Sequence, residues 1–133
     1  MGSLKVIARY RDGRMVKGTT NNFWPGTLVF HIRPADAPDA APVVVAANDL
    51  KAIFVVHSFE GNPRRIKQAH FKPADRPYGQ KLRVTFQDGE VLDGSTANYD
   101  PAVQGFFVWP ADQGGNNEKI YVLNSAVKSV RRL

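Results

Sequence analysis

The chain has 133 residues and carries 18 lysines and arginines against 12 acidic residues, which gives a formal net charge of +6 and a pI near 9.8. It contains no cysteine, and this excludes disulfide bridges, thiolate metal sites and a cysteine nucleophile. No apolar run approaches the roughly 20 residues of a membrane helix, and the first ten residues lack a signal-peptide core, so we expect a cytoplasmic protein.

A predicted β-hairpin opens the chain. Residues 5–11 alternate apolar and polar side chains, the period of a half-buried strand. Asp12-Gly13 then predicts a two-residue type I′ turn, which needs positive φ at both central residues. The return strand over 14–20 contains Gly18, which indicates a bulge or a sharp bend that lets a short sheet curl.

Three shorter strands follow in the first 57 residues. A turn of the form Asn22-Phe23-Trp24-Pro25 leads into a predicted strand over 27–32, which ends at Pro-Ala-Asp. After a variable polar loop, strands are predicted over 43–47 and 50–56. No stretch has a convincing helical period, apart from a short turn expected in the segment after residue 57.

The same pattern returns 76 residues later. Residues 5–36 align on residues 81–112 without a gap, and 11 of the 32 positions are identical. The match continues more loosely, with 43–47 on 119–123 and, after a one-residue slip, Leu50-Lys51 on Val127-Lys128. The predicted strands of the second copy are 82–87, 90–96, 104–109, 119–123 and 126–131. We predict a duplication with these parts: β repeat 1 over 1–57, a basic linker over 58–80 and β repeat 2 over 81–133.

Each predicted copy has about 55 residues, too few for an ample core of its own, so we expect the copies to pack together through an apolar interface. The order of a strand, a DG hairpin, a glycine-bearing strand, a third strand, a variable loop and two short strands resembles the small barrels of the Sm/SH3-like class. The expected fold is therefore all-β, with two tandem five-stranded barrels of this class, either separate or merged into one compact domain.

The resemblance to Sm proteins does not extend to their RNA site. The Asn-Leu dipeptide and the terminal Arg-Gly with which Sm proteins hold RNA bases are absent here. The whole chain also resembles uncharacterised bacterial domains that contain duplicated DG…G units, for which no activity follows from the resemblance.

The basic excess lies in the first copy and the linker. The net charge is +3 over 1–57, +3 over 58–80 and zero over 81–133. In a two-residue hairpin Arg11 lies opposite Arg14, and the linker adds further cations. The candidate anion-binding or ligand-binding residues are Arg9, Arg11, Arg14, Arg64, Arg65 and Lys67. The alternative interpretation is a solvated basic face that aids solubility.

Two tryptophans are candidate stacking platforms. Trp24 lies in a predicted turn, where it either stacks on a base or a peptide proline or caps the end of a barrel. Trp109 lies at the end of a predicted strand, where it either offers a stacking surface or belongs to the core or interface.

Catalysis is not expected. His31, His57 and His70 lie at no metal-site spacing, and the chain has neither a GxSxG elbow nor a phosphate-binding glycine loop before a helix. Asp88 and Glu90 flank a hairpin turn, which explains this carboxylate pair structurally. We therefore predict no catalytic residue, no metal ligand and no cofactor.

One motif points to a nucleotide. Arg64-Arg65 followed by Asp93-Gly94-Ser95 superficially resembles the segments with which PilZ-type proteins bind cyclic di-GMP. Asn98 stands where that motif has its final glycine, and the spacing from the arginines differs. The alignment of residues 93–98 with residues 17–22 of the first copy explains this segment better.

Two functional hypotheses follow. The first is a non-enzymatic binding or regulatory module for a protein or peptide partner, based on small β units with edge strands open to strand addition. The second is a nucleic-acid or nucleotide binder, cyclic dinucleotides included, which would use the basic hairpin, the linker and a stacking tryptophan. The ligand and the oligomeric state stay open.

Overall fold

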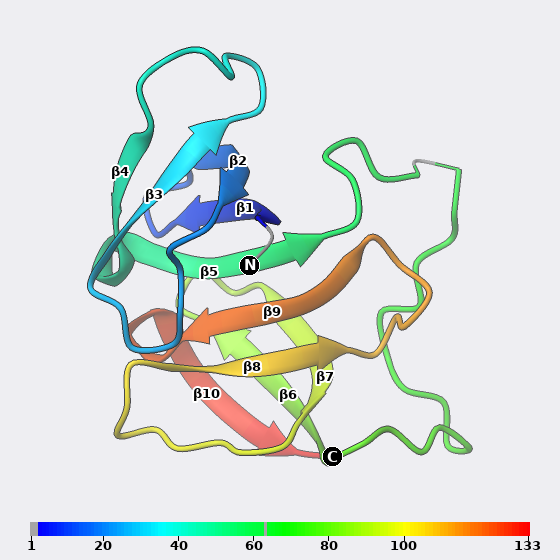
Figure 1. Cartoon of the computed structure of the whole chain (residues 1–133). Coiled ribbons are helices and arrows are strands. Elements are labelled where there is room, and N and C mark those ends of the chain that lie inside the picture. Colours follow the sequence, from blue (N-terminus) through cyan, green and yellow to red (C-terminus); the bar gives the residue numbers. More distant parts are fainter. Residues whose placement is uncertain (1–2, 63) are drawn as a thin grey trace.

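The computed structural model describes residues 3–62 and 64–133 and is all-β (Figure 1). Its strands are β1 (Leu4–Tyr10), β2 (Met15–Thr20), β3 (Val29–Pro34), β4 (Val43–Ala46), β5 (Leu50–Val56), β6 (Gln80–Phe86), β7 (Val91–Thr96), β8 (Gly105–Pro110), β9 (Asn117–Leu123) and β10 (Val127–Arg132). Two single 3-10 turns, η1 (Ala47–Asp49) and η2 (Asn124–Ala126), precede β5 and β10. In the part of the chain so described, no helix is long and apolar enough to cross a membrane.

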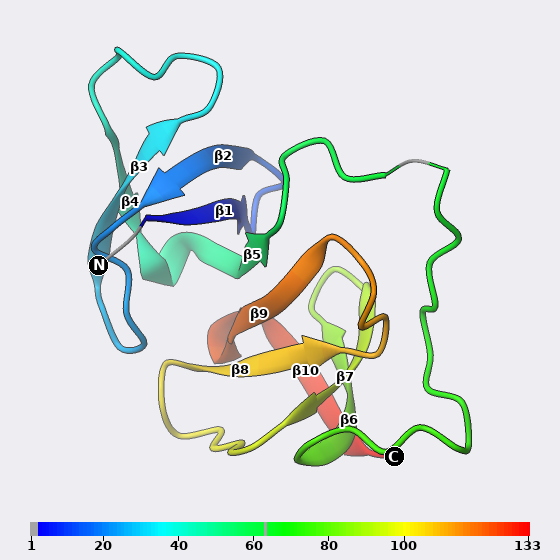
Figure 2. The same cartoon turned by 45° about the vertical axis from the view of Figure 1, so that its right-hand side comes forward.

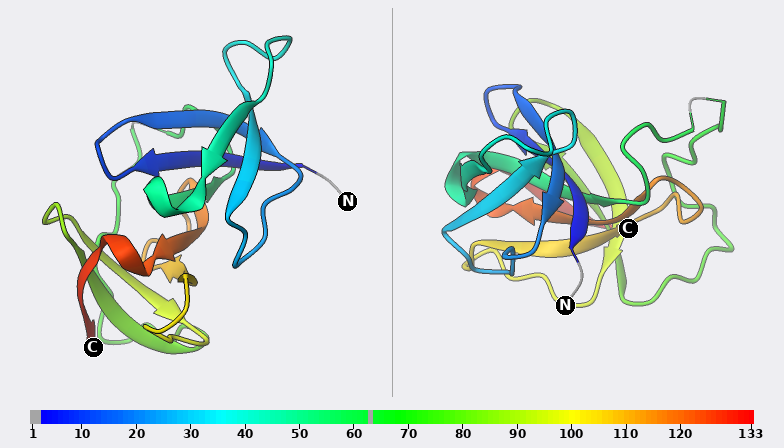
Figure 3. Two further views of the ribbon diagram at one scale, coloured as in Figure 1. Left: turned by 90° about the vertical axis from the view of Figure 1, so that its left-hand side faces the viewer. Right: turned by 45° about the horizontal axis from the view of Figure 1, so that its top comes forward.

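The ten strands pair antiparallel in one open sheet, in the order β10-β6-β7-β8-β9-β5-β1-β2-β3-β4. Strand β1 pairs with β2 and β5, β2 with β3, and β3 with β4. The pairings of β6 with β7 and β10, β7 with β8, and β8 with β9 follow the same scheme. The pairing of β5 with β9 joins these two groups, which Figures 2 and 3 show as separate bodies of strands. We call β1–β5 the first half and β6–β10 the second half.

Both hairpins have a turn that differs from the predicted one. Among the described residues only glycines have positive φ, and Gly13 (φ 95°) and Gly89 (φ 91°) are the examples in these turns. The N–H of Tyr10 donates to the carbonyl of Arg14, so three residues rather than two form the loop. This is the type I turn with a glycine bulge that is common in three-residue hairpins. The prediction of a type I′ turn, with Arg11 opposite Arg14, is therefore wrong.

The repeated glycines of β2 and β7 permit close approach of the neighbouring strand. A Cβ on Gly94 would lie 2.6 Å from the carbonyl oxygen of Trp109, and one on Gly18 would collide with the carbonyl of Arg33. Any side chain at these positions would prevent this backbone contact. The pairings of β2 and β7 show no register shift at the two glycines, so close approach explains them in place of the predicted bulge.

The alignment of the fourth strands is shifted by one residue from the predicted one. Phe30 pairs with Val45 in the first half, and Phe106 pairs with Val122 in the second. Val45 therefore corresponds to Val122 rather than to residue 121. The extra residue of the second half therefore lies between Asp112 and Ile120.

The two hydrophobic cores share the strands at the junction. Successive side chains of a strand point to opposite faces of the sheet. Accordingly, Ile53 of β5 and Tyr121 of β9 are buried in the core of the first half, whereas Ala52 and Val122 are buried in the core of the second half. The expected apolar interface is thus a pair of hydrogen-bonded strands, each of which contributes to both cores.

Candidate functional site

A buried carboxylate holds the linker against the second half. The guanidinium of Arg65 donates two hydrogen bonds, of 2.5 and 2.6 Å, to the two carboxylate oxygens of Asp112, which is only 7% exposed. These bonds, with a further one from the backbone N–H of Gln68, keep the pKa of Asp112 below its usual range although burial acts in the opposite direction. This pair fixes the linker beside the loop that precedes β9.

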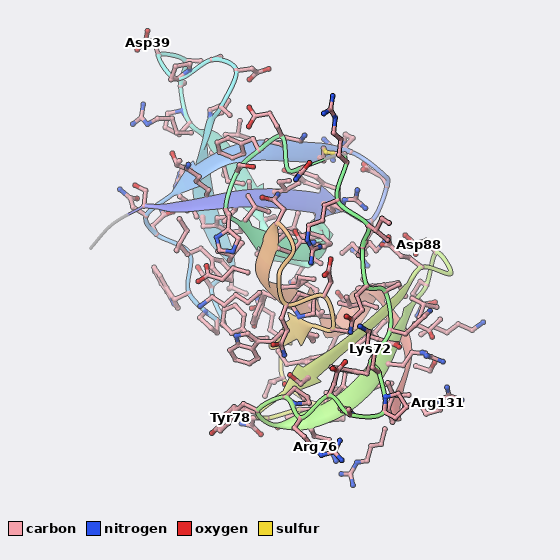
Figure 4. The ribbon with its side chains drawn as sticks, turned by 90° about the vertical axis from the view of Figure 1, so that its right-hand side faces the viewer. Asp39, Lys72, Arg76, Tyr78, Asp88 and Arg131 are labelled. Atoms are coloured by element: carbon pink, nitrogen blue, oxygen red, sulfur yellow. The ribbon has the colours of Figure 1, made fainter. Side chains whose placement is uncertain are left out.

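A second buried carboxylate holds the linker further along. Asp93 of β7 is 3% exposed and accepts hydrogen bonds from Arg83, at 2.6 and 2.8 Å. His70 of the linker lies 2.8 Å from the same carboxylate through its Nδ1 atom. Burial raises the pKa of Asp93, but the hydrogen bonds from Arg83 and His70 outweigh burial and lower it overall. The linker therefore lies along the second half (Figure 4).

An aromatic cleft lies where the end of the linker meets β8. The large rings of Tyr78 and Trp109 are 84% and 39% exposed and both line this cleft, whose volume is about 500 Å³. Its lining is Arg76, Pro77, Tyr78, Ser95, Trp109, Pro110, Gln113 and Glu118. Figure 4 shows Arg76 and Tyr78 together at the end of the linker. Rings, prolines and charges of both signs therefore surround one hollow.

A more polar cleft of about 460 Å³ shares Pro110 with the aromatic cleft. Arg65 and Lys67 line it, but the guanidinium of Arg65 is already engaged by Asp112. On its opposite side Asn116 accepts from the N–H of Ser58 at 2.9 Å and donates to the carbonyl of the same residue at 2.8 Å. These contacts fix the start of the linker after β5, and this explains the polar cleft by the structure alone.

Two of the three arginines of the first hairpin, Arg9 and Arg14, have side-chain partners in the structure. Arg14 donates to Asp12 at 2.8 Å, and its guanidinium lies 4.5 Å from the ring centroid of Tyr10. Arg9 lies 3.9 Å from the carboxylate of Glu90, with its guanidinium 5.5 Å from the ring centroid of Phe54. Both side chains therefore take part in contacts within the protein.

A buried lysine at the junction of the halves was missed by the sequence analysis. Lys51 of β5 is 6% exposed and donates to Asp88 at 2.7 Å and to Glu90. The bond from Lys51, followed by one from the N–H of Glu90, lowers the pKa of Asp88. Asp88 and Glu90, which the sequence analysis assigned to their own hairpin turn, thus neutralise a lysine of the first half. The position of Lys51 within an apolar strand was the signal that could have revealed it.

The predicted binding residues are distributed over several places. Arg65 and Lys67 line the polar cleft, and Arg11 lines a small hollow beside Phe86. The N–H of Arg64 donates to the side chain of Asn62 at 3.1 Å, and Trp24 is 59% exposed in its turn. Of the two predicted stacking residues, Trp109 is the one in the aromatic cleft.

Sequence reasoning missed Tyr78, the other ring of the aromatic cleft. The available signal was the triplet Pro77-Tyr78-Gly79, which is typical of an exposed turn.

Over residues 3–62 and 64–133, no three histidine or acidic side chains are placed to hold a metal ion.

Comparison with known proteins places the chain in a family without assigning an activity. No curated protein and no solved structure matches it. A model of a family of unknown function, DUF6982, matches residues 2–133, nearly the whole chain. The protein therefore belongs to the DUF6982 family.

Proposed function

We propose that this protein is a non-enzymatic binding module that recognises an extended, proline-containing segment of a partner protein in the aromatic cleft. The observation that carries this proposal is the joint exposure of Tyr78 and Trp109 at one hollow of about 500 Å³. Large aromatic side chains are normally buried when they serve only stability. Tyrosine and tryptophan are among the residues that dominate binding energy in protein interfaces.

The chemistry of the cleft fits a proline-rich peptide. Such a segment is already extended, so it loses little conformational entropy on binding, and its rings pack on aromatic side chains. Tyr78 and Trp109 supply the aromatic surfaces, and Arg76 and Glu118 supply charges of opposite sign at the lining. A peptide with an acidic and a basic residue on either side of its prolines matches this arrangement.

A nucleic-acid or nucleotide ligand is supported less well. Arg9, Arg14 and Arg65, three of the six candidate cations, already contact carboxylates of the protein. A nucleic acid would have to compete with these carboxylates, and Glu118 would repel it from the aromatic cleft. We therefore favour the peptide, and binding of an oligonucleotide is an outcome of the test below.

The proposal includes an architecture of two related units. We infer that residues 1–57 and 81–133 are copies of one five-stranded small barrel, joined by the basic linker over 58–80. The support is the identical scheme of strand pairing in the two halves. The aromatic cleft then lies between the second unit and the linker, which together create the site.

The test is fluorescence anisotropy with labelled proline-rich decapeptides of differing charge pattern and with labelled single-stranded DNA and RNA. Ala substitution of Tyr78 or Trp109 is expected to weaken peptide binding at least about 10-fold, because truncating an interface aromatic residue commonly costs this much. Trp24→Ala is the matched control, since Trp24 is 59% exposed outside the cleft, and should change affinity less than about 2-fold.

Two results would overturn the proposal. One is that no decapeptide binds. The other is that Tyr78→Ala binds as the parent protein does, since Tyr78 is 84% exposed and its removal leaves the fold intact. Oligonucleotide binding that depends on Trp109 and weakens steeply with added salt would replace the peptide by a nucleic acid.

A further inference from the structure

We propose a second docking site, on the first half, for an extended arginine-containing segment of a partner protein. The site is a cleft of about 500 Å³ lined by Met15, Val16, Lys17, Pro34, Ala35, Asp36 and Val43, which we call the Met15 cleft. The inference rests on the relation between the two halves that is part of the proposed function, but it concerns a different surface from the aromatic cleft.

The part of the Met15 cleft formed by Lys17, Ala35 and Asp36 corresponds to a surface of the second half that the linker covers, whereas Val91, the counterpart of Met15, is 47% exposed. The N–H of Ala35 donates to the carbonyl of Lys17 at 2.9 Å, and the N–H of Ala111 donates to the carbonyl of Asp93 at the same distance. These two backbone bonds place the carboxylates that follow, Asp36 and Asp112, at equivalent points beside β2 and β7.

The equivalent residues differ in what lies over them. In the second half Ala111 is 5% and Asp112 7% exposed, because the linker packs there with the guanidinium of Arg65 on the carboxylate. The second half thus shows an extended, arginine-bearing segment bound to this kind of surface. In the first half the equivalent residues, Ala35 and Asp36, are left exposed.

The lining of the Met15 cleft defines the chemistry of its occupant. Met15 is 47% exposed and, with Val43, offers apolar contact area, while Asp36 offers a carboxylate to a guanidinium. Lys17 occupies the place of Asp93, which holds His70 of the linker, and its Nζ donates only a long hydrogen bond of 3.4 Å to the carbonyl of Phe59. Because the charge at this place is reversed, the occupant should carry an acidic side chain where the linker has histidine.

These observations define a ligand with an arginine and, five positions later, an acidic residue. The linker of a second copy of the chain does not fit this pattern, because it carries His70 at the second position and lies on its own second half. We therefore assign the site to a segment of a different protein.

The probe that tests the site is the nonapeptide RRIKQAEFK, which is the linker sequence 64–72 with the substitution H70E. Its binding is followed by NMR through the methyl signal of Met15 in protein labelled on methionine methyl groups. We expect a saturable shift of this signal. Asp36→Ala, or a peptide with R65A, should weaken binding about 5-fold or more, since a charge-assisted pair at a partly exposed site is lost. Asp39→Ala is the matched control from the neighbouring exposed loop (Figure 4) and should leave affinity within 2-fold.

Several outcomes would contradict the Met15 cleft as a docking site. They are the absence of a Met15 shift at 1 mM peptide and an affinity that Asp36→Ala leaves unchanged. Equal binding of the peptide with histidine restored would overturn the assigned role of Lys17. Tyr78→Ala should leave this binding intact, because Tyr78 belongs to the aromatic cleft. A failure here therefore differs from a failure of the proposed function, and loss of binding in Tyr78→Ala would show that the two sites are not separate.

Discussion

Truncation of Tyr121 to alanine should destabilise both halves of the protein together. The side chain belongs to β9 of the second half, yet it is 2% exposed within the core of the first half. Its ring meets those of Phe23 and Phe107 edge to face, at centroid distances of 5.3 and 5.1 Å, and its hydroxyl donates to Gln104 at 3.0 Å.

The size of the effect follows from what the substitution removes. A buried aromatic side chain covers about 150–250 Å² of surface, which at roughly 25 cal/mol per Å² corresponds to about 4–6 kcal/mol. Measured aromatic-to-alanine substitutions in cores cost about 3–5 kcal/mol, and we expect Tyr121→Ala in this range. Tyr121→Phe removes only the hydroxyl bond and should cost about 1 kcal/mol.

Urea unfolding, followed separately through the two tryptophans, is the appropriate assay. Trp24 reports on the first half and Trp109 on the second, so each is observed in a variant in which the other is replaced by phenylalanine. Tyr121→Ala should lower both midpoints equally. Tyr99→Ala is the control, because Tyr99 is 37% exposed and has an edge-to-face contact with Phe106 inside the second half. If Tyr121→Ala shifted only the Trp109 transition, the shared-core reasoning would be refuted.

Three further predictions concern charge and backbone geometry. The lowered pKa of Asp112 adds stability that is present at neutral pH and lost as pH falls through the native pKa, so Asp112→Asn should flatten the decline in unfolding free energy between about pH 5 and pH 2; an unchanged acid slope would contradict this. Lys51→Met should raise the pKa of Asp88 toward 3.8 in an NMR titration, because the hydrogen bond from Lys51 that lowers this pKa is removed. An unchanged pKa of Asp88 would argue against the contact. Gly13→Ala should cost about 1 kcal/mol at a positive φ, and Gly18→Ala more, because its Cβ would meet a backbone carbonyl; the reverse order in urea midpoints would be inconsistent with the close approach.

Strand positions followed from local patterns because alternation and glycine placement report directly on a half-buried strand. The expected all-β class is confirmed by ten antiparallel strands. The turn type was wrong because a DG pair suits both two-residue and three-residue hairpins, and only the backbone hydrogen bond from Tyr10 to Arg14 distinguishes them. The pairing of β5 with β9 was inaccessible to local patterns, since it joins residues far apart in the chain.

The candidate site depended on contacts between distant residues, which charge counting does not reveal. Arg65 is one of five cations in the linker, but its buried partner Asp112 is 47 positions away. The same holds for Lys51, whose partner Asp88 is 37 positions away. Trp109 was a candidate because tryptophan is a chemically distinctive stacking residue, and its exposure became known only from the structure. Tyr78 lines the aromatic cleft because of the path that the linker takes.

The proposed function is tested most directly by the indole N–H signals of the two tryptophans in an ¹⁵N-resolved NMR titration. With a proline-rich decapeptide, the Trp109 signal should shift and saturate while the Trp24 signal stays in place, because only Trp109 lines the aromatic cleft. An unmoved Trp109 signal at saturating peptide would contradict the account, as would a shift of Trp24 alone.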